Sequence, residues 1–216
     1  MRFAPILALL VPALPALAEG LRVDPDAGNS TFSAVFDAKL GERITAQSSA
    51  VGCEVAFDEQ AGLAGGTCSV PLGSIVVDNE PTKSEHFRDW ATNKKSEPGA
   101  CRLEARFEGV KLGKLVAEAP VPFRARVPFT VCGRGPVDGR KELVRGTAVL
   151  FPPGSYGTSK TIRVRATVER FDRDAYQIGP KYTEGWLARV QSLAKVVAEE
   201  GTVELTLFAR PAPLAR

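Results

Sequence analysis

Apolar and polar side chains alternate with a period of two along much of the chain, and no other sequence feature restricts the fold as strongly. At positions 101–107, Cys, Leu, Ala and Phe alternate with Arg, Glu and Arg. The same alternation occurs at positions 51–57, 68–72, 121–129, 162–168 and 203–207. A period of two places one kind of side chain on each face of a β-strand. The chain is therefore predicted to be mostly β, with antiparallel strands.

Turn-forming residues separate the alternating stretches. Glycine, proline and acidic residues cluster at positions 59–62, 108–109, 136–139 and 152–154. Strands that each carry one apolar face must close into a barrel or stack as two sheets to cover that face. Both architectures satisfy the alternation, which does not choose between them.

One segment departs from the β pattern. From Thr183 to Glu200, apolar residues including Trp186 and Leu193 recur at intervals of three and four, and Gly201 follows. This spacing predicts one amphipathic helix near the C-terminus, with Thr183 as its N-cap. Such a helix would plug one end of a barrel as ordinary core, or act as a lid over a ligand opening.

The N-terminus has the features of a secretory signal peptide. Arg2 precedes a short apolar stretch, and Ala16 and Ala18 supply the small residues that a signal peptidase requires. We therefore predict a signal peptide at 1–18 and a single domain at 19–216. Removal of Arg2 lowers the formal net charge from +3 to +2. This balance favours neither nucleic acid nor a polybasic membrane surface, and no later stretch is long and apolar enough to span a membrane.

Four cysteines, Cys53, Cys68, Cys101 and Cys132, lie in the mature part of the chain. An even number of cysteines in an exported chain indicates disulfides. If 59–62 form a hairpin loop, Cys53 lies opposite Cys68, and both face the apolar side of their strands. Cys101–Cys132 then follows by elimination. It requires that Pro128 mark a bulge, because Cys132 otherwise falls on the arginine-bearing face.

The sequence carries no catalytic, cofactor or metal motif. His86 is the only histidine in the chain and would have to serve alone as a catalytic base. Zinc-type ligand spacing and a phosphate-binding loop followed by a helix are both missing from the sequence. We therefore predict a protein that is not an enzyme and has no metal or cofactor.

Several short motifs resemble the YceI-like family. They are positions 29–36, the alternating strand at 51–58, positions 69–79 followed by Glu85, His86 and Phe87, and the late segment 171–179. The resemblance spans roughly positions 21–208, although the four cysteines and the expected Trp186 helix are not part of the family pattern. It implies an exported, lipocalin-like antiparallel barrel, here of about eight strands, that binds polyisoprenoids or related apolar molecules.

The leading hypothesis is a periplasmic or secreted carrier for an elongated apolar ligand of the isoprenoid, quinone or fatty-acid type. Its alternative is an envelope interaction or stress-associated module with a packed core and no small-molecule ligand. The sequence does not indicate the oligomeric state. The candidates for an apolar interior that would hold the ligand are large aromatic residues: Phe36, Phe57, Phe107, Phe123, Phe129 and Trp186.

Overall fold

The computed structural model describes residues 19–38, 41–93, 99–183 and 197–213. The expected signal peptide and Trp186 lie outside the described residues. The elements in chain order are β1 (Glu19–Val23), η1 (Pro25–Ala27), β2 (Thr31–Ala38), β3 (Arg43–Ser48), β4 (Gly52–Asp58), β5 (Leu63–Pro71), η3 (Leu72–Ser74), β6 (Val76–Val77), α1 (Pro81–Thr92), β7 (Arg102–Lys111), β8 (Val121–Val127), β9 (Phe129–Val131), β10 (Glu142–Phe151), β11 (Thr161–Asp172), η4 (Pro180–Tyr182) and β12 (Val197–Pro211).

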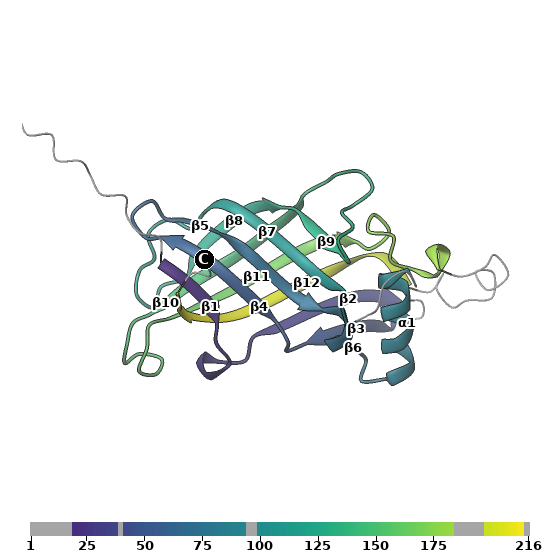
Figure 1. Ribbon diagram of the computed structural model, residues 1–216, viewed down its shortest axis with the longest axis horizontal. Helices are drawn as coiled ribbons and strands as arrows, with labels where there is room; N and C mark the ends of the chain where they lie inside the picture. The colour runs from purple at the N-terminus through teal and green to yellow at the C-terminus, as the bar shows by residue number, and fades with distance from the viewer. Residues whose placement is uncertain (1–18, 39–40, 94–98, 184–196, 214–216) are drawn as a thin grey trace, which may run out of the picture.

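The strands of the described residues form one antiparallel sheet of twelve strands, in the order β6-β3-β2-β12-β1-β4-β5-β7-β9. The 15-residue strand β12 holds the sheet together, because β11 pairs with one of its edges while β2 and β1 share the other. From β11 the sheet continues through β10 to β8. The sheet rolls into an elongated tube-like shape, and α1 lies at one end, beside β6, β3 and β2 (Figure 1).

The expected closed barrel of about eight strands is not formed, because the described residues contribute twelve strands to one open sheet. The sheet curves until β7 and β8 lie close together, but within the described ranges no ladder joins these two strands. Pro128 separates β8 from β9, and the short β9 pairs with β7 whereas β8 pairs with β10. Proline lacks the N–H that a continuous ladder requires. The ring of hydrogen bonds is therefore interrupted at this point, and the fold is a rolled, open sheet.

Both predicted disulfides are present. In the β4–β5 hairpin Asp58 lies opposite Leu63, and this register places Cys53 opposite Cys68 with 4.1 Å between their Cα atoms. Cys101 is bonded to Cys132, with 4.6 Å between Cα atoms.

The expected bulge at Pro128 is not the reason that Cys132 reaches Cys101. Val127, Phe129 and Val131 all remain on the buried face, so Pro128 does not change which face points inward. Cys132 instead lies after β9 with φ of 49°, where the chain turns and brings its sulfur to Cys101.

The helix expected at 183–200 is wrong at its C-terminal end, because Val197 to Glu200 open strand β12. β2 and β11 offer hydrogen-bond partners on both sides of this segment, with Val197 opposite Ala38 and Glu200 opposite Asp172. Tertiary pairing therefore overrides the helical spacing there. In the part of the chain that the structure describes, α1 is the only α-helix, and no helix is long and apolar enough to cross a membrane.

Candidate functional site

The rolled sheet forms two adjoining cavities, both partly open to solvent. The inner cavity, about 160 Å³, lies between the inward faces of the strands, and the outer cavity, about 640 Å³, lies between the sheet and α1. Phe32, Leu103 and Val203 line both cavities and so mark where they meet. The two cavities are therefore neighbours, the outer one at the α1 end of the sheet and the inner one further along it.

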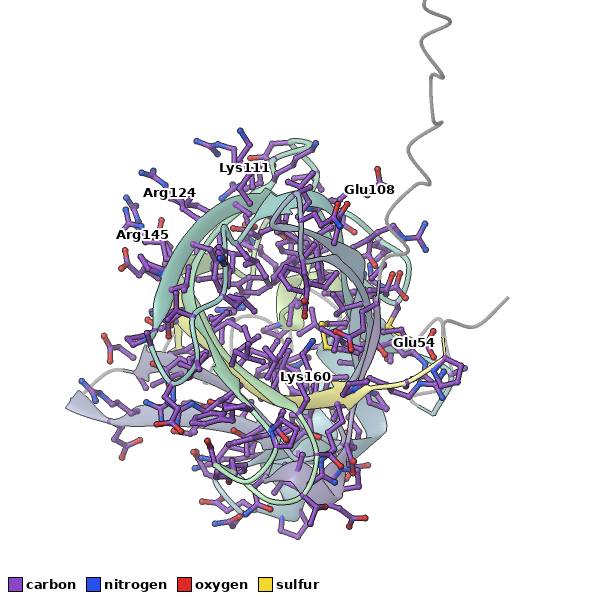
Figure 2. All side chains as sticks on the ribbon, turned by 90° about the vertical axis from the view of Figure 1, so that its left-hand side faces the viewer. Glu54, Glu108, Lys111, Arg124, Arg145 and Lys160 are labelled. Atoms are coloured by element: carbon purple, nitrogen blue, oxygen red, sulfur yellow. A yellow bond between two sulfur atoms is a disulfide. The ribbon has the colours of Figure 1, made fainter. Side chains whose placement is uncertain are left out.

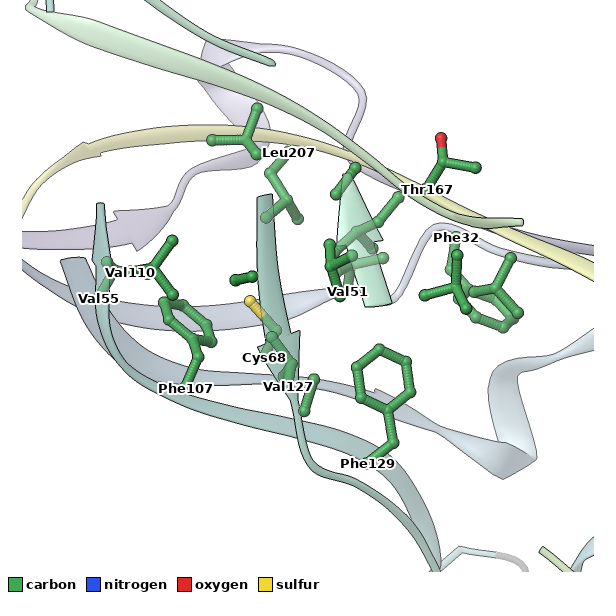
Figure 3. Close-up of a pocket in the computed structure, with 18 of the residues that line it drawn as sticks. Phe32, Val51, Val55, Cys68, Phe107, Val110, Val127, Phe129, Thr167 and Leu207 are labelled. Atoms are coloured by element: carbon green, nitrogen blue, oxygen red, sulfur yellow. The ribbon is translucent and has the colours of Figure 1, made fainter. Parts of the chain in front are cut away.

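The wall of the inner cavity is almost entirely apolar (Figure 3). Period-two alternation explains this composition, because every second residue of the surrounding strands points inward. Phe107 of β7 and Phe129 of β9 supply aromatic rings to the wall. The small side chains of Ala105 and Ala125 also line it. Apolar cavities of this size stay dry and accept small apolar molecules.

The outer cavity owes its apolar wall to α1 and the β2–β3 hairpin. Phe87 and Trp90, three positions apart on α1, face the cavity opposite Phe36 and Ile44. The buried Ser84 hydroxyl fixes the helix by accepting a hydrogen bond from Val77 N at 2.9 Å. The position of α1 therefore determines the width of the outer cavity.

The ionisable side chains that line the two cavities all belong to the outer one, and we call them its polar rim: Glu42, Lys83, His86 and Arg173. Lys83 pairs with Asp78 and Glu80, each at 2.9 Å, and these hydrogen bonds raise the pKa of its ammonium group. His86, an exposed residue of α1, stacks on Trp90 with 6.1 Å between ring centroids. A ligand with a polar head and an apolar tail would find its polar partners here.

Arg173 lies at the same rim and shapes the neighbouring loop. Its guanidinium donates to the carbonyl oxygens of Ile178 at 2.7 Å, and of Val197 and Ala198 at 3.0 Å. Burial lowers the pKa of this guanidinium. These bonds tie the loop after β11 to the start of β12. A side chain at Gly179 would come within 2.6 Å of Arg173 Nη1, so the loop requires glycine there.

Near this loop, Tyr176 donates a hydrogen bond of 2.8 Å to Oε1 of Glu142. Both residues are buried. Burial raises the pKa of the Glu142 carboxyl, and the hydrogen bond from Tyr176 opposes that rise. Because burial disfavours the charged form, the folded state holds this proton to higher pH than the unfolded chain does.

Glu142→Gln is expected to stabilise the protein relative to the native chain at pH 7 and to lose that advantage at pH 4. Folding raises the pKa of Glu142 above its value of about 4.3 in the unfolded chain. The free energy of unfolding of the native protein therefore falls as the pH rises from that value to the pKa of the folded state. Glutamine still accepts from Tyr176 but does not ionise. Urea unfolding at both pH values measures the difference. The exposed Glu204→Gln is the control, and equal pH dependence in the two variants would contradict the expectation.

The structure places the predicted interior residues in three groups. Phe107, Phe123 and Phe129 line the inner cavity and Phe36 lines the outer one. Phe57 is buried in a separate cluster and lines neither cavity. Trp186 lies outside the described residues.

Sequence reasoning missed the polar rim of Lys83 and Arg173. Arg173 lies within the 171–179 motif, so this motif was the sequence feature that could have pointed to it. Among the described residues, no group of three or more His, Cys, Asp or Glu side chains could hold a metal ion.

No protein family and no curated protein matches this sequence. Among solved structures, the chain is similar to a polyisoprenoid-binding domain from Saccharophagus degradans that is implicated in plant cell wall breakdown. The TM-score is 0.55, over 91% of this chain and 99% of that domain, at 14% sequence identity. The two proteins share a fold. At this identity the similarity establishes the fold alone.

Proposed function

We propose that the protein is an exported binding or carrier protein, of the YceI-like type, for an elongated apolar molecule such as an isoprenoid, a quinone or a fatty-acid derivative. The ligand would lie with its tail in the inner cavity and its head at the polar rim beside α1. In this proposal the protein is a binding protein and not an enzyme, and it acts in the periplasm or outside the cell.

The apolar double cavity is the observation that carries this proposal. Its outer part alone, about 640 Å³, falls within the 300–1,000 Å³ range of small-molecule sites. Burying a few hundred Å² of apolar ligand surface at about 25 cal/mol/Å² contributes up to about 10 kcal/mol before ordering costs. The apolar side chains that line the two cavities would therefore bind a long hydrocarbon tail without any specific polar contact.

Two further observations support the proposal. The Saccharophagus degradans domain of similar fold is described as polyisoprenoid-binding, which favours the same ligand class here. The two disulfides are compatible with an oxidising compartment, and the features of 1–18 favour export to one.

Native mass spectrometry of the purified mature protein, followed by organic extraction and lipid identification, tests the proposal. We expect a stoichiometric apolar adduct. An adduct-free mass that stays unchanged after incubation with isoprenoids, quinones and fatty acids would contradict the proposal and favour a module that binds other proteins.

Ala105→Phe is expected to raise the Kd of a long-tailed apolar ligand about fiftyfold. Ala105 lines the inner cavity of about 160 Å³, and cavities of roughly this size hold one benzene ring. A phenyl group there would exclude about three methylene groups of the tail, each worth about 0.8 kcal/mol. Fluorescence competition or calorimetry measures the Kd.

The matched control is Glu104→Phe, which places the same side chain one residue earlier on the outer face of β7. This variant should bind like the native protein. If both variants bind the ligand equally well, the tail does not occupy the inner cavity.

A further inference from the structure

The wall of the rolled sheet has a seam where β7 runs beside β8. Within the described residues β9 pairs with β7 only from Leu103 to Ala105, and no ladder joins the rest of β7 to β8. Arg106 N donates to Pro128 O at 3.3 Å at the end of this seam. Where strands are not joined by a ladder, their backbone groups must find other partners such as water. The seam therefore lacks the ladder of backbone hydrogen bonds that joins neighbouring strands elsewhere in the described sheet.

The outer surface around this seam is basic. Lys111, Arg124 and Arg145 point outward on the same side of the sheet (Figure 2). We call four exposed side chains the basic face, because the described residues give none of them an ion-pair partner: Lys111, Arg124, Arg126 and Arg165. None of the four is therefore in direct contact with a carboxylate of the described chain.

The register of β8 and β10 adds to this accumulation of positive charge. Arg124 lies directly opposite Arg145, and like charges in that position destabilise a sheet. Arg145 has a carboxylate partner, because its Nη1 lies 3.0 Å from Oε2 of Glu169, but Arg124 has none in the described residues. An anion outside the protein would offset the repulsion. The net charge of the predicted mature chain is only slightly positive, so this local accumulation does not follow from the overall charge of the chain.

The inner cavity lies directly behind this face. Phe123 and Ala125 of β8 line the cavity, whereas Arg124 and Arg126 of the same strand point outward. On the other side of the seam, Phe107 lines the same cavity. One layer of backbone therefore separates an apolar cavity from a cationic surface.

We propose that the basic face docks onto an anionic lipid bilayer and brings the seam against it. The proposal rests on the proposed function for its choice of partner, because the bilayer is the reservoir of apolar molecules that the cavity would hold. Charge complementarity supplies the attraction, since cationic side chains bind anionic lipid surfaces. Docking itself needs no ligand in the cavity.

Sedimentation with lipid vesicles tests docking on the ligand-free mature protein. Vesicles of phosphatidylcholine with phosphatidylglycerol should bind the protein at low salt, and vesicles of phosphatidylcholine alone should not. The double variant Arg124→Gln, Arg126→Gln should bind the anionic vesicles about 25-fold more weakly, because each basic side chain near such a surface strengthens binding about fivefold.

The matched control is Arg22→Gln with Arg43→Gln. These exposed residues lie on β1 and β3, away from the seam, and their replacement removes the same net charge. The control should bind within about twofold of the native protein, because charges beyond a Debye length are screened. Equal losses in the two double variants, equal binding to both vesicle types, or binding to a DNA duplex but not to anionic vesicles would each overturn the proposal. Those results would leave the ligand-binding test with Ala105→Phe unaffected.

Discussion

Replacement of Phe57 by alanine is expected to lower the free energy of unfolding by about 3–5 kcal/mol and to leave the affinity for an apolar ligand unchanged. Phe57 is only 2% exposed and packs against Leu21, Ala64, Ile162 and Ala209. These residues come from β1, β5, β11 and β12, so its ring joins strands that are distant in sequence. Removing the ring leaves a cavity that the surrounding sheet cannot fill.

The ligand affinity should not change, because Phe57 itself lines neither cavity, and of the four residues named above only Ala64 lines the inner one. Its cluster involves the C-terminal part of β12, which lies at the end of the sheet away from α1 (Figure 1). Phe107→Ala is the informative comparison, since Phe107 lines the inner cavity. We expect Phe107→Ala to change ligand affinity at a smaller cost in stability. Urea unfolding and ligand titration of both variants check this. A weaker ligand affinity in folded Phe57→Ala would assign Phe57 to the site instead.

Phe57 and Phe107 also show what the alternation predicts and what it does not. Both were expected to point inward, and both do. The alternation predicts which face of a strand a residue lies on. It does not predict where along the length of the rolled sheet the residue lies, because that depends on the register between strands distant in sequence. The sequence therefore did not distinguish Phe57, in the cluster at the end of the sheet away from α1, from Phe107, which lines a cavity.

Local pairing was predictable, whereas long-range pairing was not. The β4–β5 hairpin register follows from its turn, and it correctly placed Cys53 opposite Cys68. The alternation does not predict that β1 pairs with both β4 and β12. Strand β10 was missed because its apolar run at 148–151 does not alternate. The open edge between β7 and β8 was missed for a different reason, because a barrel and an open sheet share one alternation pattern.

The polar part of the candidate site was the least predictable. Lys83 and Arg173 are ordinary charged residues in sequence, and they meet at one rim only because α1 packs over β6 and the loop after β11 folds back. The carbonyl oxygens that hold Arg173 belong to Ile178, Val197 and Ala198, which include the start of β12. That segment was expected to be helical. An error in one element therefore concealed the neighbouring part of the site.

Replacement of both Cys101 and Cys132 by alanine is expected to lower the free energy of unfolding by about 3–4 kcal/mol. The two residues are 31 positions apart, and the chain-entropy cost of an open loop of that length in the unfolded state gives this figure. The disulfide also lies beside the end of α1, because Cys132 Sγ is 3.6 Å from the carbonyl oxygen of Ala91 and Arg134 donates to the same oxygen. Loss of the bond should therefore also loosen the wall of the outer cavity.

Urea unfolding of the double variant measures the loss, with Cys53→Ala, Cys68→Ala as the comparison. The 15-residue separation of that pair predicts about 3 kcal/mol. The two disulfide loops do not overlap in sequence, so removing both bonds should cost close to the sum of the two effects, about 6–7 kcal/mol. This is comparable to the whole stability of many domains, so reduction alone should bring the protein near unfolding. A loss below about 1 kcal/mol in the Cys101 and Cys132 variant would mean that the packing of β7, β9 and α1 holds this region without the bond.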